Sequence, residues 1–150
     1  MVPEPTVYLI SCVKTKQTFP CRAKDLYVSE LFAKARNYAE ASNAPWFILS
    51  AEYGLLSPEQ VVDPYERTLN KMRKEERDAW AQKVLLQIEA ELPAIKRVVF
   101  LAGNKYREGL IPALRSRGIE VCVPMEGLKI GQQLGWLKRR LHSAFQIHSS

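Results

Sequence analysis

The sequence has few cysteines, few histidines and no long apolar run. Its cysteines, Cys12, Cys21 and Cys122, are too few and too scattered for a disulfide framework or a zinc site. No apolar stretch approaches the roughly 18 residues that a membrane span needs, and no basic segment precedes a hydrophobic stretch at the N-terminus. We therefore expect a cytoplasmic protein without a signal peptide, a metal or other cofactor, or a membrane partner.

The composition is that of an ordinary globular domain. The chain has 150 residues, of which 47% are apolar and 25% are charged. This length can bury one continuous core, and the composition excludes a disordered tail or a collagen-like fibre. No internal repeat or domain boundary is visible, so we expect residues 1–150 to form a single domain.

The positive charge is concentrated in two segments. The net charge is +6, yet residues 13–24 and 129–150 each carry four cations and no anion. The second group consists of Lys129, Lys138, Arg139 and Arg140. Two basic segments on a near-neutral body are typical of a protein that binds a polyanion, and a solvated surface explains the same pattern equally well.

Apolar runs and helical periodicity alternate along the chain. Strands are predicted at residues 6–11, 46–50, 97–102 and 119–123. Helices are predicted after the candidate N-cap Ser29, and at residues 73–92, 106–117 and 130–145. This order predicts an α/β fold, a single three-layer domain with a four-stranded, mainly parallel sheet flanked by helices. Residues 51–72 are predicted to form a long, irregular, functional loop.

Polar residues follow the predicted strands at their carboxyl ends, where ligands bind in parallel sheets. Lys14 and Lys16 follow the first strand, after Ser11 and Cys12. A lysine there can hold a phosphate or, with a depressed pKa, act as a nucleophile, whereas a solvated loop cation is the simpler alternative. Cys12 suits a reactive thiol beside cations or, more simply, a small core residue.

A carboxylate and a phenol follow the second strand. Ser50, Glu52, Tyr53 and Gly54 form this segment, and Glu52 is a candidate general acid or base. A partner for a nearby lysine or backbone amide is the structural alternative for Glu52. In the long loop, Asp63 and Tyr65 flank Pro64, and Asp63 either serves a reacting water or only caps a turn.

The remaining candidates precede the first helix or follow the last two strands. Tyr27 is placed to stack on a planar ligand or to cover the core, and Ser29 caps the helix beside it. Gly103 permits close backbone approach, and Asn104 can hydrogen-bond a base edge or a phosphate. Other candidate binding residues are Tyr106 and Glu126.

These motifs together resemble the DUF6884 family of bacterial and phage proteins. The resemblance rests on Ser-Cys-x-Lys-x-Lys at 11–16, Leu-Tyr-x-Ser-x-x-Phe at 26–32, Ile-Leu-Ser-Ala-x-Tyr-Gly-Leu at 48–55, Asp-Pro-Tyr at 63–65 and Gly-Leu-x-Ile-Gly at 127–131. The first two motifs are also similar, more distantly, to the archaeosine synthase catalytic domain, YaaA-type peroxide-stress proteins and uracil-DNA-glycosylase-like folds.

This resemblance implies a uracil-DNA-glycosylase-like fold and chemistry on a nucleobase. In the archaeosine enzyme, a lysine near the cysteine does covalent work on a deazaguanine base, which implies the same role for Lys14 or Lys16. The sequence departs from that relative in two ways, since the loop before Tyr27 is longer and Phe32 stands where the relative has a histidine.

Three functions are compatible with these features. The first is an enzyme on a nucleobase in DNA or RNA, of glycosylase or base-modifying type, in which tyrosines stack on the base, Glu52 or Asp63 serves the water, and the basic last helix contacts the backbone. The second is a non-catalytic DNA- or RNA-binding module. The third is an enzyme on a free nucleotide or small phosphorylated metabolite, for which a weak salt dependence of affinity is expected.

Overall fold

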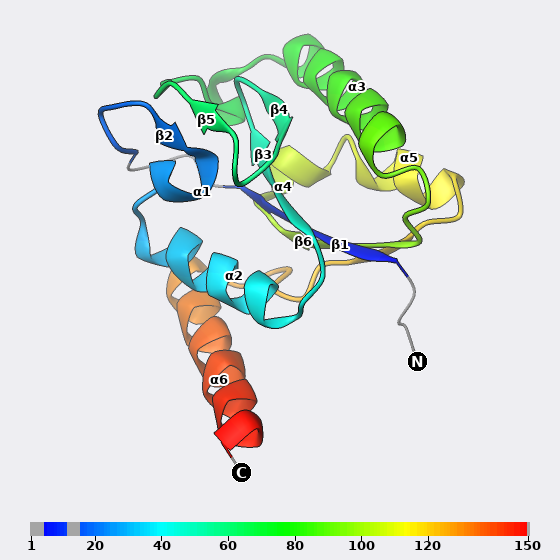
Figure 1. Ribbon diagram of the computed structural model, residues 1–150. Coiled ribbons are helices and arrows are strands. Elements are labelled where there is room, and N and C mark those ends of the chain that lie inside the picture. Colours follow the sequence, from blue (N-terminus) through cyan, green and yellow to red (C-terminus); the bar gives the residue numbers. More distant parts are fainter. Residues whose placement is uncertain (1–4, 12–15, 150) are drawn as a thin grey trace.

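The computed structural model describes residues 5–11 and 16–149, with side chains described as far as residue 141. A five-stranded sheet forms its centre, in the order β4-β3-β1-β6-β7 (Figure 1). The strands are β1 (Thr6–Ser11), β3 (Trp46–Ser50), β4 (Gly54–Leu56), β6 (Arg97–Leu101) and β7 (Glu120–Cys122). The α/β class and the four predicted strands are thereby confirmed, with small shifts in their ends.

The sheet has one strand more than the sequence predicted. β4 pairs antiparallel with β3, while β1 pairs parallel with both β3 and β6, and β6 with β7. The expectation of a four-stranded sheet was therefore wrong. The predicted loop at 51–72 is shorter than expected, because β4 lies within it. A second, two-stranded sheet pairs β2 (Cys21–Arg22) with β5 (Val61–Val62), and β5 also lies within this loop. These strands have two or three residues, too few for a periodic pattern.

The helices follow the predicted pattern closely. They are α1 (Ala23–Leu26), α2 (Glu30–Ala41), α3 (Lys74–Glu91), α4 (Asn104–Arg107), α5 (Ile111–Ser116) and α6 (Ile130–Ser149), with a 3₁₀ turn η1 (Leu69–Lys71). Ser29 caps α2, because its Oγ accepts the Phe32 N–H at 3.2 Å. The helix predicted at 106–117 is divided into α4 and α5, and Pro112 lies in the first turn of α5.

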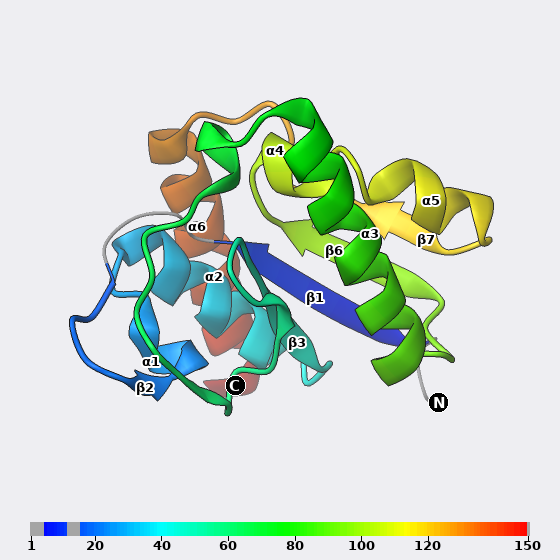
Figure 2. The same cartoon turned by 90° about the horizontal axis from the view of Figure 1, so that it is seen from above.

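Helices cover both faces of the sheet (Figure 2). Leu9 and Phe100 face one core, which α3 closes with Trp80. Ile10 and Leu101, one position further along the same strands, face the other core, which α2 and α6 close. Successive side chains of a strand point to opposite faces, and this alternation produces the three layers. Within the described residues, no helix is both long and apolar enough to cross a lipid bilayer.

The order of the strands reverses direction at β1. From β1 the chain crosses to β3 on one side, and it later returns to β6 on the other side. Connections that leave the carboxyl ends of two adjacent parallel strands in opposite directions open a crevice between them. The topology therefore places a crevice beyond Ser11 of β1 and Leu101 of β6.

Candidate functional site

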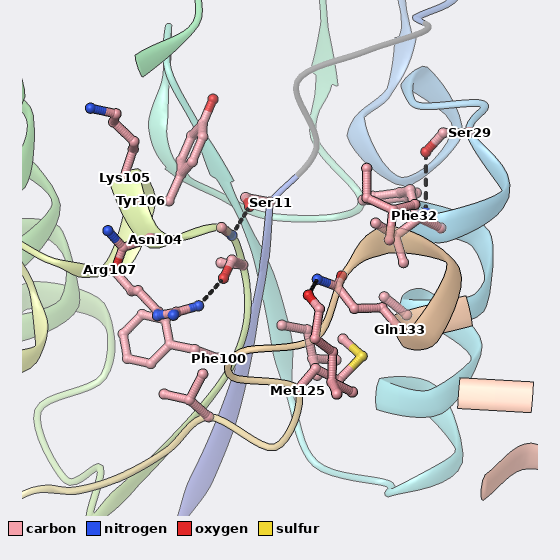
Figure 3. Close-up of a pocket in the computed structure, with 18 of the residues that line it drawn as sticks. Ser11, Ser29, Phe32, Phe100, Asn104, Lys105, Tyr106, Arg107, Met125 and Gln133 are labelled. Carbon is pink, nitrogen blue, oxygen red and sulfur yellow. Dashed lines mark hydrogen bonds between the residues drawn. The ribbon is translucent and has the colours of Figure 1, made fainter. Parts of the chain in front are cut away.

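A cavity of about 700 Å³ lies at this point of the fold (Figure 3). Its base is formed by the ends of β1 and β6, from Ser11 and from Phe100 to Gly103. Residues of α4 form one wall. The first turns of α2 and α6 and the connection from β7 to α6 form the wall across from it. Asn70, from η1, also lines the cavity, so the long loop after β4 reaches this site.

Apolar side chains make up much of the cavity surface. Phe32 of α2 and Phe100 of β6 are each 1% exposed and belong to different cores. Met125 and Leu128 approach from the connection between β7 and α6. The cavity therefore opens between the two cores at the edge of the sheet, and it offers apolar surface to a ligand.

Among the uncharged polar side chains that line the cavity, Ser11, Gln133 and Asn104 come from three different elements. Ser11 at the end of β1 accepts the Gly103 N–H at 3.1 Å, which ties β1 to the turn after β6. Gln133 of α6 donates its amide N–H to the Leu128 carbonyl oxygen at 2.9 Å, which fixes the orientation of this side chain. Asn104 of α4 is exposed and donates to Glu108 at 3.4 Å. These groups can hydrogen-bond the polar edge of a ligand.

Two cations of α4 also line the cavity, and they differ in direction. Lys105 is exposed and extends away from Ser11 in Figure 3. Arg107 is half-buried and reaches toward the end of β6, where its guanidinium donates to the Ala102 carbonyl oxygen at 2.9 Å. The carboxylate among the lining residues is Glu30, which is exposed and pairs with Lys34 at 3.6 Å.

Five of the predicted site residues line this cavity: Ser11, Ser29, Gly103, Asn104 and Tyr106. Ser29 also caps α2, so it serves both of the roles considered for it. Tyr106 is buried and packs edge-on against Trp80, with ring centroids 5.6 Å apart. Segments that follow the first and third predicted strands therefore do meet, as expected for carboxyl ends of adjacent parallel strands.

Four other predicted residues meet in a second place, which we call the tyrosine cluster: Lys16, Tyr27, Tyr53 and Tyr65. The hydroxyls of Tyr27 and Tyr65 are hydrogen-bonded to each other. The Lys16 ammonium lies 4.6 Å from the centroid of the Tyr65 ring. The Tyr53 ring packs edge-on against Tyr65 with centroids 5.7 Å apart, and its hydroxyl donates to the Asp63 carbonyl oxygen at 3.1 Å.

Phe32 connects the tyrosine cluster to the cavity. The rings of Tyr27 and Phe32 lie 4.9 Å apart, and Phe32 lines the cavity, whereas none of the four cluster residues does. Lys16 also pairs with Tyr27 through an isolated antiparallel bridge. The tyrosines thus hold the segment at 16–17, the start of α2 and the loop at 63–65 together.

Two further predicted residues, Ser50 and Gly54, shape the turn between β3 and β4. Ser50 is fully buried, and its Oγ accepts the N–H groups of Glu52 and Tyr53 at 3.2 and 2.9 Å. Gly54 has φ +75°, and a Cβ there would lie 2.3 Å from Oε1 of Gln87. A turn with these constraints explains Ser50 and Gly54 without a ligand.

The predicted carboxylates do not line the cavity. Glu52, Asp63 and Glu126 are exposed, and each lies outside the set of lining residues. Glu52 is in the turn between β3 and β4, Asp63 follows β5, and Glu126 precedes α6. Lys14 and Cys12 lie outside the described residues. Of the candidates that follow predicted strands, the structure therefore places Asn104 at the cavity and Glu52 and Glu126 outside its lining.

The predicted backbone-binding cations begin at the rim of the cavity and continue along α6. Ile130, Gln133 and Leu134 of this helix line the cavity, and Lys129 directly precedes them. Lys138, Arg139 and Arg140 are exposed further along α6. The Arg140 guanidinium lies 4.7 Å from the centroid of the Trp136 ring, which in turn packs edge-on against Tyr38 of α2.

Sequence reasoning did not predict several residues that line the cavity. These are the apolar Phe32 and Phe100 and the polar or charged Asn70, Arg107 and Gln133. Arg107 could have been found, since it lies four residues after Gly103 in the segment that follows a predicted strand. Gln133 is one turn into the last predicted helix, close to the Gly-Leu-x-Ile-Gly motif. Asn70 gives no signal, because only the folded loop brings it to the cavity.

Cys21, Tyr38, Glu59 and Arg97 have displaced pKa values, and none of these four residues lines the cavity. Burial, together with the nearby Asp25, raises the pKa of Cys21, and burial also raises the pKa of Tyr38. A hydrogen bond from Lys24 lowers the pKa of Glu59, and an interaction with Cys122 raises that of Arg97. In the described part of the chain, no three His, Cys, Asp or Glu side chains are grouped as metal ligands would be.

Two comparisons place the chain among known proteins. The family of unknown function DUF6884 matches residues 7–139, a range that includes every strand of the central sheet except the first residue of β1. The uncharacterized protein YfjM of Bacillus subtilis (strain 168) is 29% identical to the chain over 131 residues, which is 85% of each protein.

Proposed function

This chain belongs to the DUF6884 family, and we propose that it acts on a nucleobase in a nucleic acid, with the base bound in the cavity at the ends of β1 and β6. The composition of the cavity carries this proposal. A base has two apolar faces and a polar edge, and proteins that bind an extruded base cover its faces with apolar side chains and hydrogen-bond its edge. Met125 and Leu128 offer the apolar surface, while Ser11 and Gln133 offer hydrogen bonds.

The size and place of the cavity support this proposal. Its volume of about 700 Å³ is within the range of roughly 300–1,000 Å³ that is typical of small-molecule sites. It lies where the strand order reverses, which is the preferred ligand site of open α/β sheets. The uracil-DNA-glycosylase-like architecture implied by the resemblance remains part of this proposal.

Cations along α6 would hold the nucleic acid backbone. Gln133 lines the cavity, and a rise of about 1.5 Å per residue puts Lys138 roughly 8 Å further along the helix axis. Lys129, at the start of the helix, lies at the rim of the cavity. A strand whose base occupies the cavity could therefore extend its phosphates toward the exposed cations of α6, and binding should weaken as salt is added.

The reaction we propose is cleavage of the bond between base and sugar. The C1′–N bond breaks, the base leaves with the bonding electron pair and takes a proton, and a water oxygen bonds to C1′ as the water loses its proton. From the resemblance to nucleobase enzymes, we further propose that Lys14 or Lys16 serves this reaction. The ammonium of Lys16 already lies over the Tyr65 ring, which favours Lys14, the residue nearer in sequence to the cavity residue Ser11.

One observation favours a second function, a module that binds nucleic acid without catalysis. Glu52 and Asp63, the carboxylates expected to serve a reacting water, are exposed outside the cavity lining. The cavity and the cations of α6 need no carboxylate for binding. This alternative keeps the same base-binding site and removes the chemical step.

The test is a mass-spectrometric screen of the purified protein against modified and unmodified DNA, RNA and nucleosides. A free base that accumulates with time, and that is lost in Lys14→Gln, supports the enzyme. Lys96→Gln is the matched control, since Lys96 is an exposed lysine beside the start of β6, at the opposite end of that strand from the cavity. Salt-dependent binding without any released or altered base would overturn the enzyme and leave the binding module.

A further inference from the structure

Arg107 has no carboxylate partner among the described residues, whereas five other half-buried cations do. Three other arginines each lie within 4.0 Å of a carboxylate. Arg77 pairs with Glu108, and Arg97 pairs with Glu120. Arg36 pairs with both Asp25 and Glu40. Lys24 and Lys34 have such partners as well. No carboxylate of the described residues is within this distance of Arg107, whose guanidinium instead donates to the Ala102 carbonyl oxygen.

A half-buried guanidinium without a carboxylate loses hydration that no protein anion replaces. The hydrogen bond to Ala102 holds the side chain at the end of β6, on the wall of the cavity. One bond uses only part of a planar group that carries five N–H donors. Because Arg107 faces a cavity large enough for a ligand, the missing anion can be part of that ligand.

We propose that Arg107 binds a phosphate group of the ligand, so that the cavity recognises a nucleotide rather than a bare base. This inference rests on the proposed function, because it adds a phosphate to the base already assigned to the cavity. Guanidinium and phosphate form charge-assisted hydrogen bonds whose planar geometry matches better than that of an ammonium. Lys105, exposed and directed away from Ser11, is the less suitable of the two cations on this wall.

The phosphate can come from two sources. It can be the 5′-phosphate of a free mononucleotide or a phosphodiester of a nucleic acid strand, and Arg107 would bind either. The two sources predict different ligands. A mononucleotide site should bind a nucleoside 5′-monophosphate well, whereas a strand site should need a short single-stranded oligonucleotide.

The experiment compares the affinities of matched ligands by isothermal titration calorimetry. The probes are the four common nucleosides, their 5′-monophosphates, short single-stranded oligonucleotides of the same bases, and ribose 5-phosphate. We expect the phosphate-bearing ligands to bind the wild-type protein about tenfold or more tightly than the nucleosides. In Arg107→Gln this gain should fall to about twofold or less, because the glutamine side chain is uncharged and shorter and carries fewer N–H donors.

Arg115→Gln is the matched control. Arg115 is an exposed arginine of α5 outside the cavity lining, and the same loss of charge there should leave the gain unchanged. Circular dichroism and the unfolding midpoint show whether each variant is folded, and Arg107→Lys, which keeps the charge without the planar fork, replaces Arg107→Gln if that variant does not fold. A partial loss of the gain in Arg107→Lys is the expected result.

Different results overturn the two proposals. If Arg107→Gln keeps the full gain, or if nucleosides bind as tightly as both the 5′-monophosphates and the oligonucleotides, the phosphate site is excluded while the base pocket stands. If ribose 5-phosphate binds through Arg107 as tightly as the nucleotides do, the phosphate site stands and the nucleobase proposal fails. An absence of binding for every probe contradicts both.

Discussion

The residues of the cavity and of the tyrosine cluster were predicted as one site, but the structure separates them into two sites whose polar groups make different contacts. In the cluster, the polar groups contact each other, as Tyr27 and Tyr65 share a hydrogen bond and Lys16 covers the Tyr65 ring. In the cavity, side chains from separate elements are held by main-chain groups and face a space of about 700 Å³. Such contacts within the cluster are typical of a structural role, and side chains held around an open space are typical of a binding site.

This difference shows that residue type alone does not distinguish a ligand site from a polar support. Both places contain hydroxyls and cations that follow predicted strands or flank the first helix. They differ in what those groups contact, and this depends on the tertiary structure. Substitutions in the cluster should therefore reduce stability, whereas substitutions in the cavity should reduce binding with little effect on stability.

The largest effect is expected at Gly54, next to Tyr53 of the cluster. Gly54→Ala should lower the free energy of unfolding by about 2–4 kcal/mol, because φ is +75° and the new Cβ would displace the Gln87 Oε1 that accepts the Leu55 N–H at 2.8 Å. Gly118→Ala is the matched control, since its φ is +79° but no atom lies within 4 Å of the added Cβ. That variant should lose only about 1–2 kcal/mol.

Urea unfolding followed by tryptophan fluorescence measures both variants. The Trp80 indole reports on this region, because its N–H donates to the Ser50 carbonyl oxygen at 2.8 Å. Equal losses in the two variants would mean that the close approach of Gln87 costs nothing and that the turn between β3 and β4 tolerates a Cβ at residue 54.

The next effect is expected at Tyr65. Tyr65→Phe removes the hydroxyl partner of buried Tyr27 and should cost about 1–2 kcal/mol of stability. A double-mutant cycle with Tyr27→Phe should give a coupling energy of about 0.5–1 kcal/mol or more. Ligand affinity in the cavity should change less than about twofold, since Tyr65 does not line it.

Tyr53→Phe serves as the comparison for Tyr65→Phe. It removes one hydrogen bond to a main-chain carbonyl at a half-buried position and should cost about 0.5–1 kcal/mol. A large loss of ligand affinity in Tyr65→Phe, with unchanged stability, would show that the tyrosine cluster is part of the binding site and not only a structural support.

Ser11 tests the opposite side of the comparison. Ser11→Ala removes an acceptor for the Gly103 N–H at the base of the cavity, and we expect a loss of affinity for nucleotide ligands of about three- to tenfold. Its effect on stability should stay below about 1 kcal/mol, because Ser11 is only half-buried. Ser116→Ala, a serine of α5 away from the cavity, should leave affinity unchanged. A variant that loses stability but not affinity would contradict the assignment.

The smallest effect is expected at Glu59, in the long loop that carries β5. Lys24 donates to Glu59 at 2.8 Å and holds the pKa of this carboxyl below its ordinary value. A lowered pKa in the folded state gives stability above the ordinary pKa of a glutamate, and this stability is lost as the pH falls through the folded value.

Glu59→Gln should therefore be slightly less stable than the wild type near pH 7, and the difference should vanish in acid. Urea midpoints measured across the acid range in which the protein stays folded test this. Glu66→Gln, a change at an exposed glutamate of the same loop, is the control. A difference that does not depend on pH would show that Glu59 acts through packing rather than through its charge.

The sequence predicted the framework well, because long apolar segments with clear periodicity form the same elements in almost any context. The strand at 6–11, the Ser29 cap and the helix stripe of Trp80, Val84 and Ile88 depend on neighbours in sequence or on burial alone. β4 and β5 are defined by their pairing instead, β4 with its neighbour β3 and β5 with the distant β2. Their two or three residues contain too little pattern, so the central sheet gained a strand that the sequence did not indicate.

The division of the predicted site was decided by the tertiary structure. The sequence by itself determined which residues follow strand ends, and so brought Ser11, Gly103 and Asn104 to one cavity. It did not determine that Tyr53 and Tyr65 would contact each other, or that no carboxylate of the described residues would pair with Arg107, since both facts depend on distances that only the folded chain sets. Packing sets those distances, and with them which polar groups are satisfied within the protein and which face a ligand.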